Sequence, residues 1–351
     1  MGKEKIGLTL AGGGAKGAYQ IGVYRAMLDC NIKIEGITGT SIGSFNAAMI
    51  AAGDFYKLEE FWLNEDVGKL LGFDGDMNID KKNYKDKLKE LSIPIKSVLK
   101  NKGIPITGLK SKLEEIVDED KLRKSKLDYG LVTYKVKTKE ALYMYKEDIP
   151  KGNLTDYIVA SCYLPVFHYE KLHDDSYYLD GSFYDAEPYT MLVKKGYTKI
   201  YVVELGAIGV THKNKSDVKI IRIKPSRSLG MMLNTNTYKI KENMELGYYD
   251  AIKKLKKLDG NKYVFKKHSN WYYNLLVRNM PKRIRKRAEI FFLTRNNKEL
   301  VIKSIEYVLK KEEKTYMNIY TCSKEIKRLK KRYKKDKSLI VYEFISNLKL
   351  F

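Results

Sequence analysis

Short apolar runs alternate with helical stretches over the first 250 residues of the chain. Residues 6–10, Ile-Gly-Leu-Thr-Leu, form the first run and precede a stretch with helical spacing at 18–28. Later strand-like runs lie at 199–204 and 218–223. Strands separated by helices are typical of βαβ units and a parallel sheet. The pattern therefore predicts an α/β fold of three α/β/α layers, with a mostly parallel central sheet.

The last hundred residues follow a different pattern. Apolar residues recur there at helical spacing, as at Ile302 and Ile305, and lysine and arginine fill many of the positions between them. Residues 251–351 contain 29 Lys and Arg against 9 Asp and Glu, a net charge of +20, while the residues before them hold 38 against 34. We predict one domain over residues 1–258 and a Lys/Arg-rich helical region over 259–351.

Residues 39–43 read Gly-Thr-Ser-Ile-Gly, between an apolar run and a small-residue stretch at 44–52. G-x-S-x-G in this context is the sequence form of a nucleophile elbow, a sharp strand-to-helix turn with serine at its apex. Gly39 and Gly43 then lie where a side chain would clash with neighbouring backbone. The motif predicts that Ser41 is a nucleophile. The alternative is a tight turn in which Ser41 only caps the helix.

A glycine cluster at residues 12–17, Gly-Gly-Gly-Ala-Lys-Gly, joins the first strand-like run to its helix. Such a loop leaves backbone N–H groups unobstructed at the positive end of a helix dipole, which favours an anion. Beside Ser41, that anion is the oxygen that gains charge when an ester is attacked. The cluster also reads G-x-G-x-x-G, with Glu35 near the position of a ribose-binding acid, so a dinucleotide-binding oxidoreductase is a remote alternative. The serine elbow directly after Glu35 argues against it.

An aromatic and apolar run at residues 177–179 ends in Asp180, Gly181 and Ser182. An aspartate at the carboxyl end of a strand can project into the mouth of an α/β sheet. The alternative is an Asp-Gly turn in which Asp180 bonds its own backbone. The two glycine motifs that come before it favour the first interpretation.

In this order, the three motifs resemble the signatures of the patatin-like phospholipase family: a G-G-G-x-[RK]-G loop, a G-x-S-x-G elbow and a D-G-[GA] element. The resemblance covers roughly residues 5–258, and a further family-like patch lies at 160–165. Ser182 departs from the usual glycine or alanine, but serine is small enough to keep the turn. The resemblance implies a patatin-like fold and a lipid acyl hydrolase of phospholipase A or lysophospholipase type.

The resemblance also implies a Ser–Asp dyad, with Ser41 as nucleophile and Asp180 as general base. Lys16 stands where the family carries Arg or Lys; it anchors the loop, attracts a phosphate headgroup, or is a solvated charge. The oxyanion-hole amides implied are those of Gly12, Gly13 and Gly14. The glycines implied to support the turns are Gly17, Gly39, Gly43 and Gly181.

Three other functions remain as alternatives. A Ser–His–Asp triad would need a histidine, but we interpret all four as surface or structural residues: His168, His173, His212 and His268. A non-catalytic lipid- or membrane-binding module could retain the same scaffold. An acyltransferase would replace water with an alcohol. We predict no cofactor. We also predict no metal, because the three cysteines are few and widely spaced, which indicates reduced thiols and no metal cage.

We expect a cytoplasmic protein that acts on a lipid substrate. No run approaches the roughly 18 consecutive apolar residues of a transmembrane helix, and the first strand starts too early to leave room for a signal peptide. The basic region is a solvated extension, a peripheral contact with an anionic membrane, or a nucleic-acid surface. No recognition motif supports specific nucleic-acid binding. The oligomeric state is left open.

Residues 64–126 are the least regular part of the first domain. Helix-like stretches lie at 82–91 and 109–119. An insertion over the active site would suit a lid that sets substrate size. The alternative is a peripheral excursion with no gating.

Overall fold

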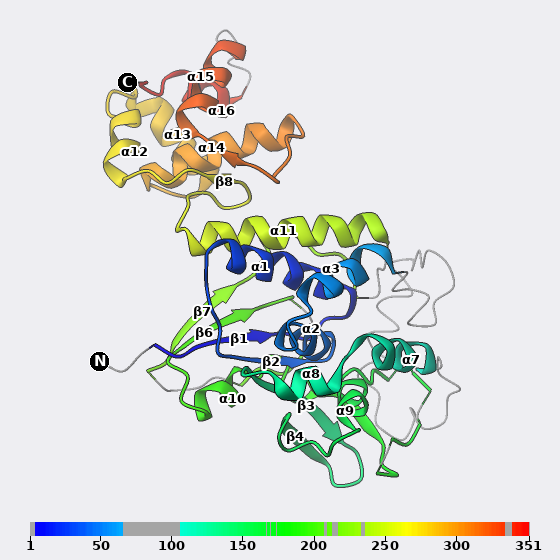
Figure 1. Ribbon diagram of the computed structural model, residues 1–351. Helices are drawn as coiled ribbons and strands as arrows, with labels where there is room; N and C mark the ends of the chain where they lie inside the picture. Colours follow the sequence, from blue (N-terminus) through cyan, green and yellow to red (C-terminus); the bar gives the residue numbers. More distant parts are fainter. Residues whose placement is uncertain are drawn as a thin grey trace. The chain divides into compact units, whose positions relative to one another are not determined.

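The computed structural model describes residues 4–65, 106–165, 167–168, 170–172, 174–206, 209–212, 217–232, 236–333 and 339–350 (Figure 1). The chain divides into two compact units, Met1–Tyr248 and Tyr249–Phe351. The division falls inside helix α11 (Thr237–Leu255), and the boundary predicted at 258/259 lies just after this helix. Of the stretch predicted as a lid, residues 66–105 lie outside the described residues, and so does the helix predicted at 82–91.

A seven-stranded sheet forms the centre of the first unit, in the order β4-β3-β2-β1-β6-β7 with β5 beside β3. Strands β3, β2, β1, β6 and β7 run parallel to one another, whereas β4 and β5 run antiparallel to β3. The prediction of a mostly parallel sheet is therefore confirmed. The strands are β1 (Ile6–Leu10), β2 (Gly36–Thr40), β3 (Asp128–Lys135), β4 (Glu140–Tyr145), β5 (Tyr178–Asp180), β6 (Lys199–Val203) and β7 (Lys219–Ile223).

Helices cover both faces of this sheet, as the α/β pattern predicted (Figure 1). In β2, Gly39 faces the backbone of α2, while Gly36, on the opposite face of the strand, faces Tyr197 just after α10. Helices α1 and α9 pack beside α2. The helices are α1 (Ala18–Asp29), α2 (Ile42–Ala51), α3 (Phe55–Asn64), α7 (Thr107–Ile116), α8 (Glu119–Lys124), α9 (Leu154–Ser161) and α10 (Tyr189–Lys194), with 3-10 turns η1 (Gly14–Gly17) and η2 (Gly181–Phe183).

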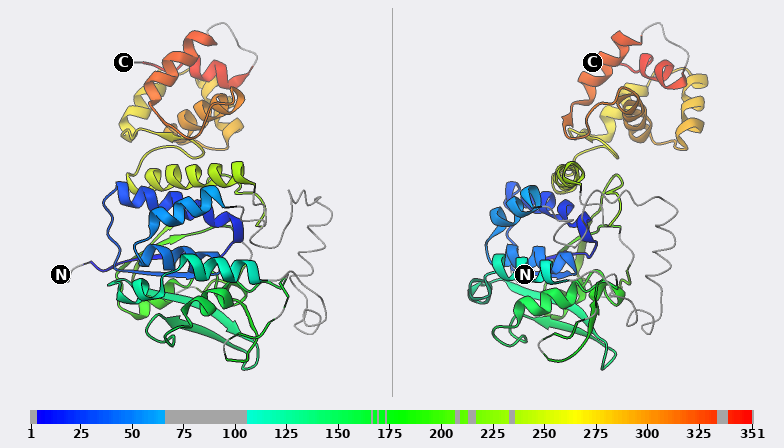
Figure 2. Two further views of the ribbon diagram at one scale, coloured as in Figure 1. Left: turned by 45° about the vertical axis from the view of Figure 1, so that its right-hand side comes forward. Right: turned by 90° about the vertical axis from the view of Figure 1, so that its right-hand side faces the viewer.

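The first part of α11 lies along α1 in both views of Figure 2. The two helices touch through glycine: a Cβ built at Gly22 of α1 would overlap the carbonyl oxygen of Met244, and one at Gly247 would overlap that of Tyr19. Glycine at these positions lets the two backbones approach closely. In the part of the chain that the structure describes, no helix is long and apolar enough to cross a bilayer.

The second unit has a core of its own, built around α14. Ile302, Ile305 and Val308 of this helix are buried, as their helical spacing predicted, and so is Leu300. Many lysines and arginines of the second unit are exposed. Because this unit has a buried core, the basic region is a packed helical domain. Its elements are β8 (Val264–Phe265), α12 (Asn270–Val277), α13 (Lys282–Phe292), α14 (Asn297–Lys311), β9 (Ile319–Tyr320), α15 (Cys322–Arg332) and α16 (Ile340–Ser346).

Candidate active site

The register of β3 brings Ser41 and Asp180 together. Thr40, the last residue of β2, pairs with Val132 of β3. The next residue of β3, Thr133, pairs with Asp180 of β5. Strand β4 pairs along one edge of β3. Strands β2 and β5 therefore share the opposite edge, where the pairing of β5 begins just beyond the last pair of β2, and β5 runs antiparallel to β2. The chain leaving Thr40 therefore meets the end of β5.

Ser41 has the strained backbone of an elbow. Its φ of 55° and ψ of −133° lie outside the regions that residues with a side chain favour. A Cβ built at Gly39 would overlap the carbonyl oxygen of Gly43, and one built at Gly43 would overlap that of Leu10. Only glycine fits at either position, which allows β2 to turn directly into α2. Strain of this kind costs about 1–3 kcal/mol and needs support from the surroundings.

That support includes Ser161, at the end of α9. The Ser41 N–H donates to Ser161 Oγ over 2.8 Å, and Ser161 Oγ donates to the Val132 carbonyl over 2.7 Å. Ser44 Oγ also donates to the Ser41 carbonyl, over 2.7 Å. Sequence reasoning marked residues 160–165 as a family-like patch but assigned Ser161 no role. The signal available was a small polar residue in that patch, shortly before Asp180.

Asp180 is completely buried. Its Oδ1 accepts a hydrogen bond from the Ser182 amide over 2.8 Å. Its Oδ2 receives no hydrogen bond of ordinary geometry from the described residues, although the Ser41 hydroxyl is close enough to lower the pKa of the carboxyl. Burial acts more strongly and raises the pKa of Asp180 to about 6, against the opposing effects of Ser41 and Ser182. The buried carboxylate thus retains an open acceptor.

The glycine loop lies against this pair. A Cβ built at Gly12 would overlap Ser182 Oγ and lie 3.3 Å from Ser41 Cβ. The Gly12 amide is already used, since it donates to the Ala186 carbonyl over 3.2 Å. The amides of the next two loop residues, 13 and 14, donate no hydrogen bond to another described residue. The Gly12 amide is therefore not free to be an oxyanion donor, and of the three predicted donors Gly13 and Gly14 stay as predictions.

The other residues singled out in the motifs have structural contacts. Lys16 Nζ lies 3.5 Å from the Gly206 carbonyl oxygen, and partial burial lowers the pKa of the lysine. This contact fits the loop-anchoring interpretation of Lys16. Gly17 packs against the first residue of α2. A Cβ at Gly181 would overlap the Val132 carbonyl oxygen, so glycine allows β5 to turn tightly beside β3.

The described histidines have contacts of other kinds, which for His168 involve only its backbone. His212 Nε2 hydrogen-bonds the Tyr184 carbonyl over 2.9 Å, and the His168 carbonyl accepts from the Tyr163 hydroxyl. His268 belongs to the second unit and stacks on Tyr272. His173 lies outside the described residues. Within the ranges that the structure describes, His, Cys, Asp and Glu form no group of three or more that could hold a metal ion.

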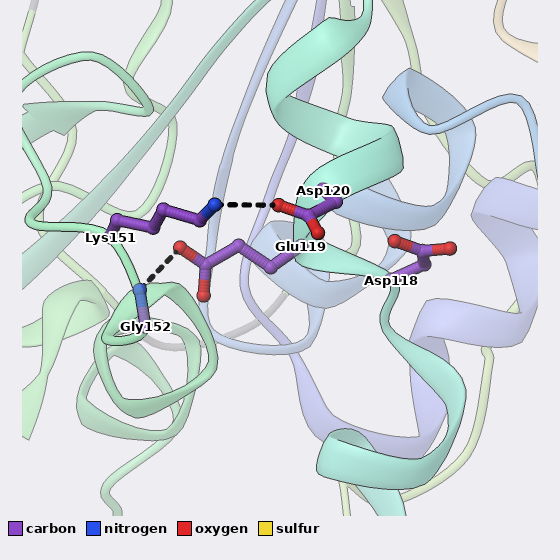
Figure 3. Close-up of a pocket in the computed structure, with 5 residues that line it drawn as sticks. All are labelled: Asp118, Glu119, Asp120, Lys151 and Gly152. Atoms are coloured by element: carbon purple, nitrogen blue, oxygen red, sulfur yellow. Dashed lines mark hydrogen bonds and ion pairs between the residues drawn. The ribbon is translucent and has the colours of Figure 1, made fainter.

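A separate hollow of about 340 Å³ opens beside the first turn of α8 (Figure 3). Its charged groups are engaged with one another or with backbone. Asp120 pairs with Lys151 over 3.4 Å, and Glu119 accepts from the Gly152 amide over 2.8 Å. Asp118 caps the helix by accepting from the Lys121 amide. The hollow is lined by Asp118, Glu119, Asp120, Lys151 and Gly152. None of them belongs to the three sequence motifs, and the contacts of the carboxylates are structural.

Comparison with known proteins matches the first unit. A family model described as Patatin-like phospholipase matches residues 8–193, which include all three motifs. Patatin-like phospholipase domain-containing protein 7 of Rattus norvegicus is 27% identical over 206 residues, 58% of this chain and 14% of the relative. Lysophospholipase NTE1 of Yarrowia lipolytica is 28% identical over 212 residues, 59% of this chain and 13% of the relative. The chain thus spans only a small part of these relatives.

Solved structures show a looser similarity. VipD from Legionella pneumophila gives a TM-score of 0.46 at 12% identity, covering 98% of this chain and 83% of that one. Human GIVD cytosolic phospholipase A2, in complex with a methyl gamma-linolenyl fluorophosphonate inhibitor, gives 0.40 at 8% identity, covering 72% and 58%. Because both scores are below 0.5, the architecture is defined by the strand order and register described above.

Proposed function

The chain belongs to the patatin-like phospholipase family, and on that premise we propose that it is a lipid acyl hydrolase of phospholipase A or lysophospholipase type. In this proposal Ser41 and Asp180 form the catalytic dyad. One observation carries this proposal. Consecutive residues of β3 pair with Thr40 and with Asp180, so the elbow that follows Thr40 lies beside the Asp180 carboxylate.

The reaction follows from the open acceptor of Asp180. Oδ2 takes the proton of the Ser41 hydroxyl while Oγ forms a bond to the ester carbonyl carbon. Charge develops on the carbonyl oxygen, where the Gly13 and Gly14 amides can donate. Collapse of this intermediate breaks the ester C–O bond, and the leaving alcohol takes the proton from Asp180. An acyl group then remains on Ser41.

Water then releases the acyl group in a second step, in which Asp180 again acts as general base. Asp180 accepts a proton from water as the water oxygen attacks the acyl carbon. The C–Oγ bond then breaks, the fatty acid leaves, and the proton returns to Ser41. A pKa of about 6 suits this work, because the carboxyl is ionised at neutral pH yet more basic than an exposed aspartate.

We propose further that the protein is cytoplasmic and meets its lipid at a membrane surface. The net charge of +20 over residues 251–351 supports contact with anionic headgroups. Each basic residue near such a surface contributes about 1 kcal/mol. The second unit would then hold the first unit near its substrate.

A fluorophosphonate probe tests the nucleophile. We expect the probe to label the wild-type protein and the Ser228→Ala control, which changes an exposed serine, but not Ser41→Ala. Mass spectrometry on a mixed phospholipid extract should show fatty acid and lysophospholipid, and should identify the bond that breaks. Failure of the wild type both to be labelled and to release fatty acid would favour the non-catalytic binding module.

The histidines provide the control for the dyad. Single alanine substitutions of His168, His212 and His268 should each retain most activity, because none is assigned a part in the reaction. If His212→Ala is as inactive as Ser41→Ala, a triad replaces the dyad.

A further inference from the structure

Helix α13 has two opposite faces that differ in chemistry. Ile284 and Ala288 are buried in the core of the second unit. Lys282, Lys286 and Ile290 repeat every four residues along the opposite side and are exposed. The outward stripe therefore begins with cations and becomes apolar toward the end of the helix.

The apolar end of this stripe is unusually exposed for large side chains. Ile290 is 65% exposed and Phe291 is 47% exposed, and Leu293, at the helix C-cap, is 90% exposed. Leu293 also has a φ of 51°, a conformation that glycine usually takes at helix ends. Leu293 is not part of the buried core of the second unit. These three residues are named the α13 tip.

The cations beside the α13 tip are available for an external anion. Lys282, Arg283 and Lys286 are exposed, and none forms an ion pair with another described residue. The neighbouring Arg287, by contrast, pairs with Glu343 over 2.9 Å. Cations that form no ion pair among the described residues thus lie on the same helix as exposed apolar side chains, in a unit with a large positive charge.

We propose that the α13 tip inserts into the interface of an anionic phospholipid bilayer while the neighbouring cations contact headgroups. The helical rise places Ile290 about 6 Å and Leu293 about 10 Å beyond Lys286 along the helix. If the helix enters end-on, these distances match the depth of about 5–10 Å to which apolar side chains of interfacial segments are buried. The long lysine side chains can remain with the phosphates at that depth. This inference rests on the membrane contact proposed above and names the surface that makes it.

A bilayer explains both halves of the surface. Nucleic acid would attract the same cations through its phosphates, but phosphates give no reason to expose Ile290 and Leu293. Apolar side chains gain free energy only when they leave water. An anionic bilayer offers a charged layer directly above an apolar one, in the order in which the stripe presents them.

Co-sedimentation of the full chain with vesicles tests this surface. The vesicles contain phosphatidylcholine with roughly one third phosphatidylserine, and neutral vesicles serve as comparison. The double variant Ile290→Ser/Leu293→Ser should bind about 30-fold more weakly at both low and high salt. Lys282→Gln/Lys286→Gln should lose about 25-fold at low salt, and much less at high salt.

Two matched variants separate the tip from general effects. Lys324→Gln/Lys327→Gln removes the same charge from exposed positions of α15, and it should weaken binding less than the α13 pair. Tyr56→Ser removes a side chain that is 75% exposed on α3 and should change nothing. A polarity-sensitive fluorophore on Leu293→Cys should shift to the blue with anionic vesicles, while the same label on Lys324→Cys should not.

The outcomes distinguish this inference from the functions on which it rests. If the wild type binds anionic vesicles but the tip variant binds equally well and the label at position 293 stays in water, the tip assignment is overturned. If the wild type binds no vesicles, the membrane contact itself is wrong. Hydrolysis of a soluble short-chain ester is measured in parallel and reports on the dyad alone.

Discussion

Two buried carboxylates, Asp180 in the first unit and Asp259 in the second, differ in their hydrogen bonding. In the first unit, Asp180 is fully buried and its Oδ2 has no hydrogen bond of ordinary geometry among the described residues. In the second unit, Asp259 is 4% exposed, but it accepts from the Tyr273 hydroxyl over 2.8 Å and the His268 amide over 2.9 Å, and it pairs with Lys298. Asp259 is therefore satisfied, whereas Asp180 keeps an open acceptor.

Glu306 of α14 is a second buried carboxylate that is satisfied by hydrogen bonds, as Asp259 is. Its Oε1 accepts from three consecutive backbone amides, at residues 261–263, and so closes the loop before β8. A carboxylate with its acceptors filled holds structure together. One with an acceptor left open beside a hydroxyl is poised to take a proton. Burial is common to both kinds of carboxylate. Hydrogen bonding is therefore the property that distinguishes a structural role from a chemical one.

The largest effects should come from the dyad. Ser41→Ala and Asp180→Asn should each lower the hydrolysis rate by at least about a thousandfold, because each removes a group that changes bonds in the reaction. The measurement is the rate of fatty-acid release from phospholipid. Residual activity within tenfold of the wild type in either variant would contradict the assignment.

Asp180→Asn should also stabilise the fold. A raised pKa means that the folded protein favours the protonated carboxyl, so the ionised form opposes folding above about pH 6. A shift from 3.8 to about 6 corresponds to about 3 kcal/mol of unfolding free energy. Urea denaturation near pH 8 should show that Asp180→Asn is more stable than the wild type by up to this amount. The difference in stability should shrink as the pH falls through 6 toward 3.8.

Asp259→Asn should have the opposite effect on stability. The change leaves Lys298 without its partner and weakens a satisfied cluster, at a cost of about 3 kcal/mol. Hydrolysis of a soluble ester should be unchanged while the protein is folded. The matched control is Glu299→Gln, because Glu299 is half exposed and pairs with Lys303; its effect should stay within about 0.5 kcal/mol. Equal changes in the free energy of unfolding for Asp180→Asn and Asp259→Asn would remove the distinction between open and satisfied buried carboxylates.

Ser161→Ala should have an intermediate effect. It leaves the buried Ser41 amide and the Val132 carbonyl without their shared partner, which costs about 1–3 kcal/mol of stability. A looser elbow should lower kcat about tenfold with little change in KM. Ser304→Ala also removes a buried serine, but one that donates within α14 of the second unit. The kcat of Ser304→Ala should equal that of the wild type. An equal loss of kcat in Ser161→Ala and Ser304→Ala would show that the elbow is not involved.

Ser182→Gly should have the smallest effect. Activity should fall as the pH drops through about 6, because Asp180 must be ionised to accept the Ser41 proton. The Ser182 hydroxyl lowers the pKa of that carboxyl, so its removal should move the acidic limb of the kcat profile to higher pH and leave the plateau in place. A shift to lower pH would show that the hydroxyl acts in another way.

The local chemistry of the site could be predicted from the sequence. The G-x-S-x-G spacing around Ser41 reflects a backbone too crowded for side chains, and this crowding depends on residues close in the chain. Helical spacing likewise identified the buried face of α14, because 3.6 residues per turn is a local property. The three motifs were therefore visible, and so was the alternation of strands and helices.

The partners of these motifs depended on the tertiary structure. The β3–β4 hairpin was not predicted, since Gly130 and polar residues interrupt the apolar pattern of β3. Yet β3 is the strand that aligns Thr40 with Asp180, and it does so through an antiparallel β5. The role of Ser161 and the use of the Gly12 amide by Ala186 also arise from contacts between distant segments. Sequence spacing fixes the conformation of neighbouring residues, whereas strand pairing is chosen by the packing of the whole unit, and that choice determines which side chains can react together.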